Sequence, residues 1–408
     1  MPLRPLRSLR TPVRLAVAAA TVLAATVVAT PSPVSALDAC APTPDMLASA
    51  PVRQFAVPGG AYARVWDTGT LPDVLQERRL AAVRIPAGSL TPTVVTAPTV
   101  SQTARPSSMV AADARAVVAI NGGTFDVSAR GIPDRVQIAH GRVRKLIRQT
   151  DANGYFGGIV VDSSSKTIRS GAFDVDGGFT TPAGTAVVGA VNWQWLATEG
   201  VSVYTRSWGA NAAHPAGPRT VVVRGGAVVR ILGSTATGRP GLWESWVTAP
   251  AGTEAAALLA QAKVGQRATV RWSAVGTYRY EGQPAGAFSR PTGATGSGGA
   301  IVKDGVNVAP CTSRDELSRA RSVLVWDKDG NMLVVAVAGR TRFQGGLSVH
   351  QFADLLVQLG AVTAIRLDGG GSTALWVRKT VGGPLIRLDR PGTAYEPSVV
   401  DAVAFRAL

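Results

Sequence analysis

Residues 364–377 read AIRLDGGGSTALWV and form the clearest structural pattern in the chain. An apolar run ends at Leu367, a glycine-rich acidic turn spans 368–373, and a second apolar run begins at Ala374. Short apolar runs bounded by glycine are typical of buried strands. The pattern therefore predicts strand, turn and strand, with Asp368 held at the end of a strand on a rigid scaffold.

The segment before this turn predicts a helix that begins after Ser348. Ser348 and Gln351 have the spacing of a capping box, and Gly360 stands where such a helix would end. The apolar residues between them recur on one helical face: Phe352, Leu355, Leu356 and Leu359. Further upstream, 332–337 is a continuous apolar run and predicts a central strand.

Most other apolar segments are short and predict strands. They are 64–66, 81–85, 116–120, 157–161, 220–223 and 268–272. A helix capped by Thr253 is expected over 253–262, and the Pro- and Thr-rich segment 86–107 is expected to be a loop. With 45 glycines and 26 prolines available for turns, we predict an α+β fold. It would be a strand-rich mixed sheet with a few packed helices in a single large domain.

The N-terminus has the pattern of a secretory signal peptide. Four arginines in the first 14 residues precede an apolar run over 15–29, and small residues then lead to Ala36. We expect cleavage near Ala36 and a secreted protein, extracellular or associated with the cell wall. A signal anchor, or a lipoprotein attached at Cys40, is the alternative.

The expected division of the chain follows from this leader and from composition. It comprises a signal peptide over 1–36, N-terminal strands with a Pro/Thr-rich connection over 37–110, and a catalytic domain over 111–408. No later run is long and apolar enough to predict a transmembrane segment in the mature protein.

The two cysteines, Cys40 and Cys311, both fall in the part expected to be exported. An even cysteine count outside the cytoplasm predicts a disulfide between them, and two unpaired thiols are the alternative.

The formal net charge of +16 favours an acidic partner. Such a charge suits a phosphorylated glycan, an anionic wall polymer or an anionic membrane surface, or it serves only solubility. The sequence has no zinc-finger, helix-turn-helix or RNA-recognition pattern, so we expect no nucleic-acid partner.

The turn at 368–373 is the first candidate site segment. Its glycines, Gly369, Gly370 and Gly371, allow successive N–H groups to point at one anion. Asp368 adds a carboxylate, and the hydroxyls come from Ser372 and Thr373. This combination predicts a polar cup for a phosphate or a sugar, and an ordinary tight turn is the alternative.

Two further glycine turns and two arginines are candidates for the same site. Asn121-Gly122-Gly123 follows a buried strand, and 295–299 contains Gly298 and Gly299. Arg321 precedes one predicted strand and Arg340 follows another, and an arginine at a strand end can bind a phosphate with two hydrogen bonds. Hairpin turns and solvated surface charges are the alternatives.

Taken in order, these segments resemble the phosphodiester glycosidase family. The similar segments are 119–125, 203–209, 296–299 with Asp304-Gly305, 321–330, Gly339-Arg340, 348–360 and 367–372. The resemblance covers roughly residues 80–408, and its last segment is the most specific. Two positions depart from the family pattern: Ala320 stands where a proline is usual, and Glu396-Pro397 stands where an Arg-Pro pair is common.

The resemblance implies hydrolysis of the bond between a sugar's anomeric carbon and a phosphodiester. It implies catalytic roles for Asp368, Asn121 and Arg321. The expected substrate-binding residues are Gly122, Gly123, Gly298, Gly299, Arg340, Gly369, Gly370, Gly371, Ser372 and Thr373. Because the leaving phosphate has a second pKa of about 6, it departs readily when its charge is met by cations and N–H donors.

Other functions stay open at this stage. A carboxylate at a phosphate site can also hold a divalent cation, and the sequence does not decide whether one binds. A metal-dependent phosphodiesterase that cuts the P–O bond and a non-catalytic protein that binds an anionic wall polymer are the alternative functions. A Ser372/His350 hydrolase is disfavoured because no Gly-x-Ser-x-Gly motif surrounds Ser372.

Overall fold

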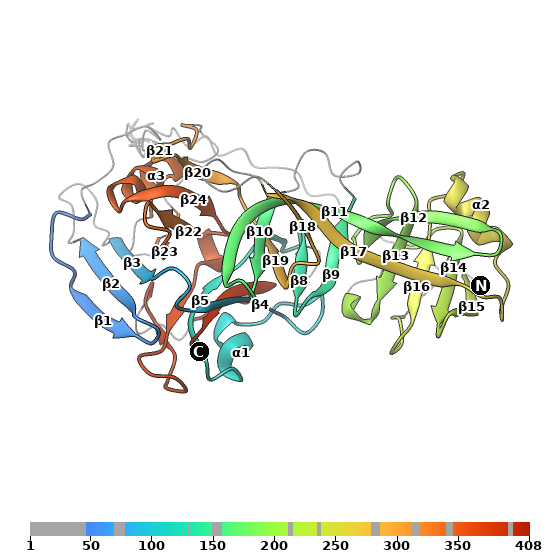
Figure 1. The fold of residues 1–408 in the computed structure, drawn as a ribbon, viewed down its shortest axis with the longest axis horizontal. Helices are drawn as coiled ribbons and strands as arrows, with labels where there is room; N and C mark the ends of the chain where they lie inside the picture. The colour runs from blue at the N-terminus through green and yellow to red at the C-terminus, as the bar shows by residue number, and fades with distance from the viewer. Residues whose placement is uncertain are drawn as a thin grey trace, which may run out of the picture. The chain divides into compact units, whose positions relative to one another are not determined.

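The chain folds mainly into β-strands (Figure 1). The computed structural model describes residues 46–68, 78–128, 131–148, 157–210, 215–234, 238–278, 286–311, 319–339, 346–390 and 395–408. The expected signal peptide, Cys40 and Arg340 lie outside these residues, so the predicted leader and the predicted disulfide remain predictions.

An eight-stranded sheet carries the residues that lead into the Asp368 turn. Its strands, in spatial order, are β1 (Arg53–Val57), β2 (Ala61–Thr68), β3 (Arg78–Ile85), β23 (Met332–Val337), β22 (Arg321–Asp327), β24 (Ala361–Arg366), β20 (Ala300–Lys303) and β21 (Val306–Asn307). All neighbours pair antiparallel. The central strand predicted over 332–337 is confirmed as β23.

A five-stranded sheet carries the residues that lead into the Asn121 turn. Its strands, in spatial order, are β26 (Ile386–Arg387), β25 (Leu375–Val377), β5 (Ala116–Asn121), β27 (Asp401–Arg406) and β4 (Thr91–Thr96). The segment 86–107 was expected to be a loop, and this expectation is wrong because β4 lies within it. The β-branched residues Thr93, Val94 and Val95 are buried in β4, and Pro92 is tolerated because β4 is an edge strand.

The two sheets share one hydrophobic core, and alternation along the strands explains how. In β22, Leu324 belongs to this core, whereas its neighbours Val323 and Val325 belong to a second core on the opposite face. The second core is closed by α3 (Val349–Gln358). Because successive strand residues point to opposite faces, one apolar run covers both cores.

Helix α3 forms as its sequence predicts. The Ser348 hydroxyl accepts a hydrogen bond from Gln351 N, and the Gln351 side chain accepts one from Ser348 N, which completes the capping box. Gly360 has φ +88°, a left-handed conformation that ends the helix without a Cβ clash.

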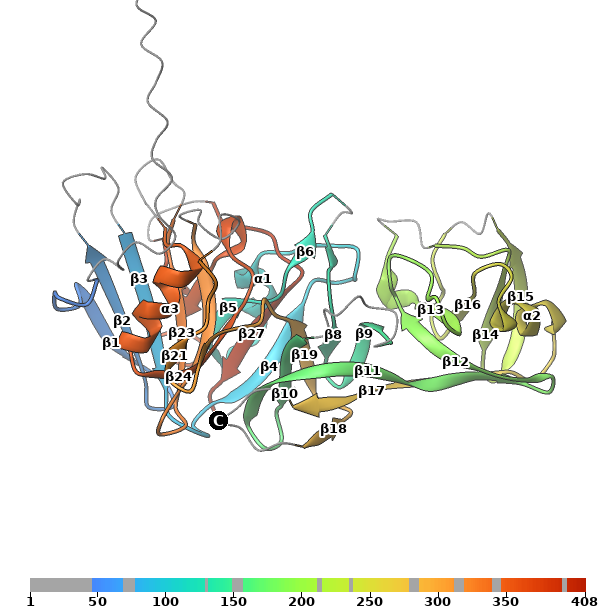
Figure 2. The same ribbon diagram turned by 90° about the horizontal axis from the view of Figure 1, so that it is seen from above.

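A twelve-stranded sheet forms the rest of the described chain. Its strands, in spatial order, are β15 (Ala227–Gly233), β14 (Arg219–Arg224), β16 (Ser245–Thr248), β13 (Val201–Thr205), β12 (Gly184–Val191), β9 (Arg142–Ile147), β8 (Gln137–Ala139), β19 (Gly293–Gly296), β10 (Gly157–Asp162), β11 (Thr167–Thr181), β17 (Thr269–Tyr278) and β18 (Ala287–Ser289). The long strands β11 and β17 pair antiparallel and run out to a lobe that contains β12 to β16 and α2 (Glu254–Gln261) (Figure 2).

The remaining elements are short. They are the pair β6 (Phe125–Asp126) and β7 (Ile132–Pro133), helix α1 (Pro106–Ala111), and the 3₁₀ turns η2 (Arg206–Trp208) and η3 (Gly370–Ser372).

The predicted α+β class is wrong, because the fold is β-rich. The described residues contain three α-helices, of 6, 8 and 10 residues. Helix α3 was anticipated, and so was α2 with its Thr253 cap. However, most apolar surface is buried where strands face strands. The two clear helical patterns in the sequence therefore led to a predicted helical content that was too high. No helix in the described part of the chain has the length and hydropathy needed to cross a membrane.

Candidate active site

The Asn121 and Asp368 turns lie side by side, although 247 residues separate them in sequence. β5 ends at Asn121, and β24 ends two residues before Asp368. Asp368 N donates to Gly122 O at 2.9 Å, and Asn121 Nδ2 donates to Asp368 O at 2.8 Å. The structure therefore brings together two of the three expected catalytic residues through their strand ends.

Asn121 is fully buried and uses both ends of its amide within the protein. Its Oδ1 accepts from Ser322 Oγ at 2.7 Å and from Ala374 N at 3.1 Å. These contacts tie β5 to β22 and to both ends of the Asp368 turn. Asn121 thus holds the turn in place, whereas the sequence-based expectation was that it contacts the sugar or the phosphate.

The glycine amides of the turn do not converge on one point as the sequence suggested. Gly369 N donates to Asp368 Oδ1 at 2.8 Å, and Gly370 N donates to Ala320 O at 2.7 Å. Gly370 has φ +63°, a conformation that favours glycine. Two of the three glycine N–H groups therefore stabilise the turn and its carboxylate, and the expected nest for an external anion is not formed by them.

The Asp368 carboxyl is partly buried and strongly perturbed. Burial raises its pKa to about 6, although hydrogen bonds from the Ser372 hydroxyl and Gly369 N act in the opposite direction. The negative charges of Asp134 and Asp401 raise the pKa further. A carboxylate with a pKa near neutrality is suited to exchange a proton with a substrate or with water.

Asp401, which the sequence analysis did not single out, holds the Asn121 turn in place through hydrogen bonds. Its carboxylate is buried and accepts from Gly123 N at 3.0 Å, Thr295 Oγ1 at 2.7 Å and Gln137 Nε2 at 2.9 Å. Burial raises the pKa of Asp401, opposed by these hydrogen bonds and by the charge of Arg144. The sequence gives little signal for this role, because Asp401 simply begins the last strand.

Close packing explains why glycines occupy the second and third candidate turns. A Cβ on Gly123 would lie 2.8 Å from Gly296 O, and one on Gly298 would lie 2.5 Å from Arg366 Nε. Gly298 N donates to Arg366 O at 2.7 Å, and Gly299 has φ +88°. The turn at 295–299 is thus joined to the end of β24, two residues before Asp368.

Arg321 lies beside the Asp368 turn, as expected, and is largely buried. Its Nε donates to Leu347 O at 3.1 Å, and its Cδ is 3.8 Å from where a Cβ on Gly369 would stand. Arg340, the other expected phosphate ligand, lies outside the described residues.

Two arginines missed by the sequence analysis also flank this region. Arg366 lies against Gly298, and Arg135 packs on Gly296 and hydrogen-bonds Ser297 O. The region around the turn is therefore richer in cations than the sequence analysis expected.

Two buried hydroxyls near the turn have no hydrogen-bond partner among the described residues. They belong to Thr373, which is 1% exposed, and to Ser297, which is fully buried. A buried hydroxyl without a partner costs stability, so such groups mark places where a bound molecule restores the missing hydrogen bond. Thr373 was among the expected substrate-binding residues, and Ser297 was not.

A fully buried lysine, Lys145, was also missed. Its Nζ donates to Pro133 O and lies 3.9 Å from the centre of the Trp193 ring. Burial lowers the pKa of Lys145, opposed by the charges of Asp134 and Asp126. The negative charge of Asp134 also raises the pKa of Asp368.

The described residues contain no group of three or more His, Cys, Asp or Glu side chains that could hold a metal ion. His350 Nδ1 lies 3.0 Å from Ala309 O and 3.3 Å from Asn307 Nδ2, so its ring is engaged at the start of α3.

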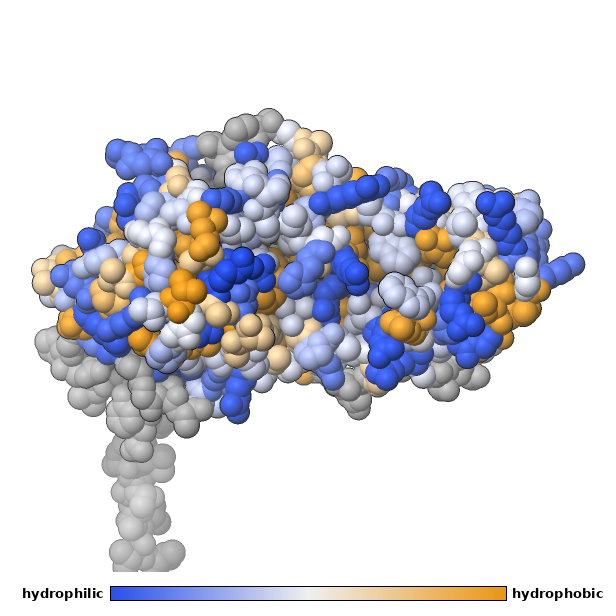
Figure 3. All heavy atoms as spheres, turned by 60° about the horizontal axis from the view of Figure 1, so that its bottom comes forward, coloured by the Kyte–Doolittle hydropathy of each residue, from blue (hydrophilic) through white to orange (hydrophobic). Residues whose placement is uncertain are grey.

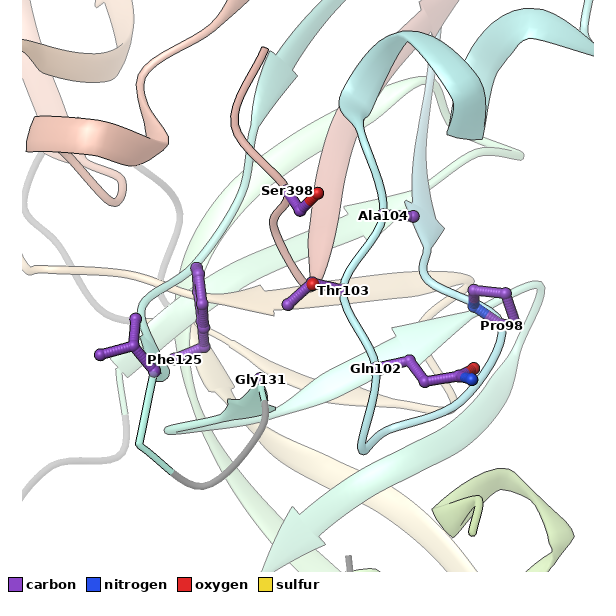
Figure 4. Close-up of a pocket in the computed structure, with 8 residues that line it drawn as sticks. Pro98, Gln102, Thr103, Ala104, Phe125, Gly131 and Ser398 are labelled. Atoms are coloured by element: carbon purple, nitrogen blue, oxygen red, sulfur yellow. The ribbon is translucent and has the colours of Figure 1, made fainter. Parts of the chain in front are cut away.

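A cavity of about 750 Å³ opens next to the Asn121 segment. Phe125 and Gly131 form one wall, and Gln102, Thr103 and Pro98 line the opposite side (Figure 4). None of the residues of the Asn121 or Asp368 turns lines this cavity.

The two departures from the family pattern have local explanations. The Ala320 carbonyl accepts from Gly370 N, a role that a proline carbonyl can also fill. The Glu396 carboxylate accepts from Ser107 N at 2.7 Å and from Ser107 Oγ, at the start of α1. Glu396 therefore satisfies a helix N-terminus, which favours a negative rather than a positive side chain.

Residues 219–406 match the family model of phosphodiester glycosidases. The resemblance to this family is therefore confirmed. The matched range includes Arg321 and the whole Asp368 turn, and Asn121 lies before it. No curated protein matches the chain.

Solved structures with a similar fold include two bacterial proteins. A hypothetical protein from Synechocystis has a TM-score of 0.62 and 21% identity, over 85% of this chain and 62% of that one. A putative exported protein from Burkholderia pseudomallei has a TM-score of 0.59 and 18% identity, over 81% of this chain and 74% of that one. This chain thus spans less than two thirds of the Synechocystis protein, and at these identities the likeness shows the fold.

The catalytic domain of zebrafish N-acetylglucosamine-1-phosphodiester α-N-acetylglucosaminidase is also similar. Its TM-score is 0.42 with 12% identity, over 87% of this chain and 88% of that domain.

Proposed function

We propose that the protein is an exported hydrolase that cleaves a sugar-1-phosphodiester at the glycosidic C–O bond. Water attacks the anomeric carbon, the bond from that carbon to the phosphate oxygen breaks, and the phosphomonoester leaves with the bonding electrons. The proton lost by water goes to the Asp368 carboxylate. The products are a free sugar and a phosphomonoester.

The observation that carries this proposal is the position of Asp368 beside the ends of β5 and β24, which belong to two different sheets. Asp368 also lies within residues 219–406, the range that matches the family model of phosphodiester glycosidases. The raised pKa of about 6 makes the ionised carboxylate basic enough to accept a proton near neutral pH. Asn121 and Asp401 act as positioning residues, because their hydrogen bonds fix the turn and the neighbouring Gly123.

The charge of the leaving group is met by the cations around the turn. A phosphomonoester has a second pKa of about 6 and needs little protonation to leave. Arg321 lies against Gly369 of the turn and Arg366 against Gly298, and preorganised cations stabilise charge that develops in the transition state.

A turnover assay tests the proposal. Incubation with methyl N-acetylglucosamine-1-phosphodiester should release free sugar and methyl phosphate, and Asp368→Asn should abolish that release while Asp176→Asn, an exposed carboxylate on β11, retains it. Absence of release across a panel of sugar-1-phosphodiesters would favour a non-catalytic protein that binds an anionic wall polymer.

Hydrolysis in ¹⁸O-labelled water separates C–O from P–O cleavage. The proposal expects the label in the sugar, whereas a metal-dependent phosphodiesterase would place it in the phosphate. The same reaction run with a chelator tests whether a divalent cation contributes.

We further propose that the protein acts outside the cytoplasm. The basic and apolar leader that ends near Ala36 supports this localisation. N-terminal sequencing of protein recovered from the culture medium should give a chain that begins close to Leu37.

A further inference from the structure

A second groove, of about 850 Å³, lies between the lobe and the turn that joins β8 to β9. It is bordered by the β8–β9 turn, the end of β13 with η2, the segment 239–245, and β17 with the residues after β18. None of its lining residues belongs to the Asp368 or Asn121 turns, so it is separate from the candidate active site.

The groove is positively charged. Its lining includes four exposed arginines: Arg142, Arg206, Arg239 and Arg290. Among the described residues, no carboxylate forms an ion pair with any of them. The one acid in the lining, Glu244, is already engaged by Arg230 at 2.9 Å and by Trp246 Nε1 at 3.1 Å. We call this feature the arginine groove.

The arginine groove also contains an exposed aromatic side chain on a strained backbone. Trp243 is 77% exposed and has φ 65°, and Arg290 has φ 51°. Positive φ is uncommon for residues other than glycine and strained for a bulky one, so such outliers point to a functional constraint. Trp272 adds a second, partly buried indole to the same lining.

Together these groups indicate the chemistry of a ligand. Guanidinium groups bind phosphates through paired hydrogen bonds, and an exposed indole provides a flat apolar surface for the C–H face of a sugar. An alternation of sugars and phosphates fits both. On the face of the molecule shown in Figure 3, blue hydrophilic residues are interspersed with orange hydrophobic patches.

The arginine groove and the cavity beside Phe125 share one lining residue. Pro98 lines both the arginine groove and the 750 Å³ cavity, whose far wall is Phe125 (Figure 4). Phe125 follows Gly123 by two residues, and Gly123 adjoins Asp368 through Gly122. A polymer that leaves the groove past Pro98 would reach the cavity lined by Phe125, which lies two residues beyond Gly123.

We propose that the arginine groove binds a further stretch of a sugar–phosphate polymer whose terminal sugar-1-phosphodiester is cleaved at Asp368. This inference rests on the proposed function for its view of the substrate. It adds that the preferred substrate is a polymer rather than a small phosphodiester.

The experiment compares a polymer with its repeat unit. The probes are a homopolymer of N-acetylglucosamine-1-phosphate, the methyl phosphodiester of one such unit, neutral dextran and oligo(dT). The variants are Arg206→Ala with Arg239→Ala, and Trp243→Ala. The matched controls are Arg105→Ala with Arg115→Ala, two exposed arginines outside the groove, and Trp195→Ala, an indole that is 64% exposed.

Both groove variants should bind the homopolymer roughly tenfold or more weakly, because the arginine variant loses charge-assisted contacts and Trp243→Ala loses the flat apolar surface for the sugar. Their kcat and KM for the methyl phosphodiester should not change, and the control variants should bind the polymer normally. Unchanged polymer affinity in the groove variants would overturn the proposal, and so would tighter binding of oligo(dT) or equal binding of dextran.

The two proposals fail in different ways. Polymer binding that is lost in the groove variants, without hydrolysis of any probe by the wild type, supports the groove and contradicts the proposed function. Hydrolysis of the polymer with the same KM in wild type and groove variants supports the proposed function and contradicts the groove.

Discussion

The Asp368 turn and the arginine groove both present charge, but they are built in opposite ways. The turn is held by strand ends from two sheets, and its carboxylate is shielded enough to have a pKa of about 6. The groove carries four exposed arginines without acidic partners among the described residues. The charge state of Asp368 depends on burial and hydrogen bonds, whereas the strength of the interactions made by the groove arginines depends on solvent and ionic strength. The predictions below test this contrast.

The largest effect is expected from Asp368→Asn. Loss of a general base lowers rates by about 10²–10⁴-fold, so kcat for a sugar-1-phosphodiester should fall by that range. Asp176→Asn serves as the control, with unchanged kcat. A fully active Asp368→Asn enzyme would show that the turn has no catalytic role.

Asp401→Ala should cause the largest loss of stability. Removing the carboxylate leaves the donors of Gly123, Thr295 and Gln137 without their acceptor, which costs about 2–4 kcal/mol of unfolding free energy. Urea unfolding measures this value, and Arg239→Ala in the groove should change it by less than about 0.5 kcal/mol. Equal losses of unfolding free energy in Asp401→Ala and Arg239→Ala would show that the site and the groove do not differ in their dependence on buried hydrogen bonds.

The raised pKa of Asp368 predicts a pH-dependent stability. Its folded pKa of about 6 exceeds the ordinary value of 3.8, so the folded state binds the proton more tightly. The contribution of protonated Asp368 to the free energy of unfolding is therefore fully present below about pH 4 and is lost as pH rises through about 6. Asp368→Asn should remove this decline, worth about 3 kcal/mol between pH 4 and pH 7.5.

Thermal unfolding of wild type and Asp368→Asn across this pH range provides the measurement. Parallel pH profiles for the two proteins would contradict the raised pKa. If Asp368 acts as a base, kcat/KM of the wild type should also rise with pH through about 6.

The smallest effect is expected from salt. Raising ionic strength from about 0.05 M to 0.5 M shortens the Debye length to a few ångströms and screens the exposed arginines. The KM for a sugar–phosphate polymer should rise roughly fivefold, while the KM for the methyl phosphodiester changes less. Equal salt effects on both substrates would mean that the two regions do not differ in this respect.

The parts of the site that sequence reasoning found are those with local signals. Asp368 follows an apolar strand and precedes three glycines, and Asn121 follows a buried strand in the same way. The parts it missed have no local signal. Asp401 is an ordinary first residue of a strand, and Arg135 and Arg366 contact the turn at 295–299 only through the packing of segments distant in sequence.

The error in fold class has a related cause. Helix α3 could be predicted in detail, because its caps and apolar face are encoded within about a dozen residues. The partners of each strand are not encoded locally, since β3 pairs with β23 and β4 pairs with β27 across most of the chain. Sequence patterns therefore gave the elements but not the number of strands that each sheet would collect.

By itself the sequence determined helices α2 and α3, several of the strands, the glycine turns and the resemblance to phosphodiester glycosidases, because periodicity, caps and turn chemistry act over a few residues. Only the tertiary structure decided that Asn121 hydrogen-bonds to the Asp368 turn and holds it in place. It also decided that two glycine N–H groups donate to acceptors within the protein rather than to a bound anion, and that an arginine groove lies at the base of the lobe. These properties arise from contacts between residues tens to hundreds of positions apart, and such contacts form only when the sheets assemble.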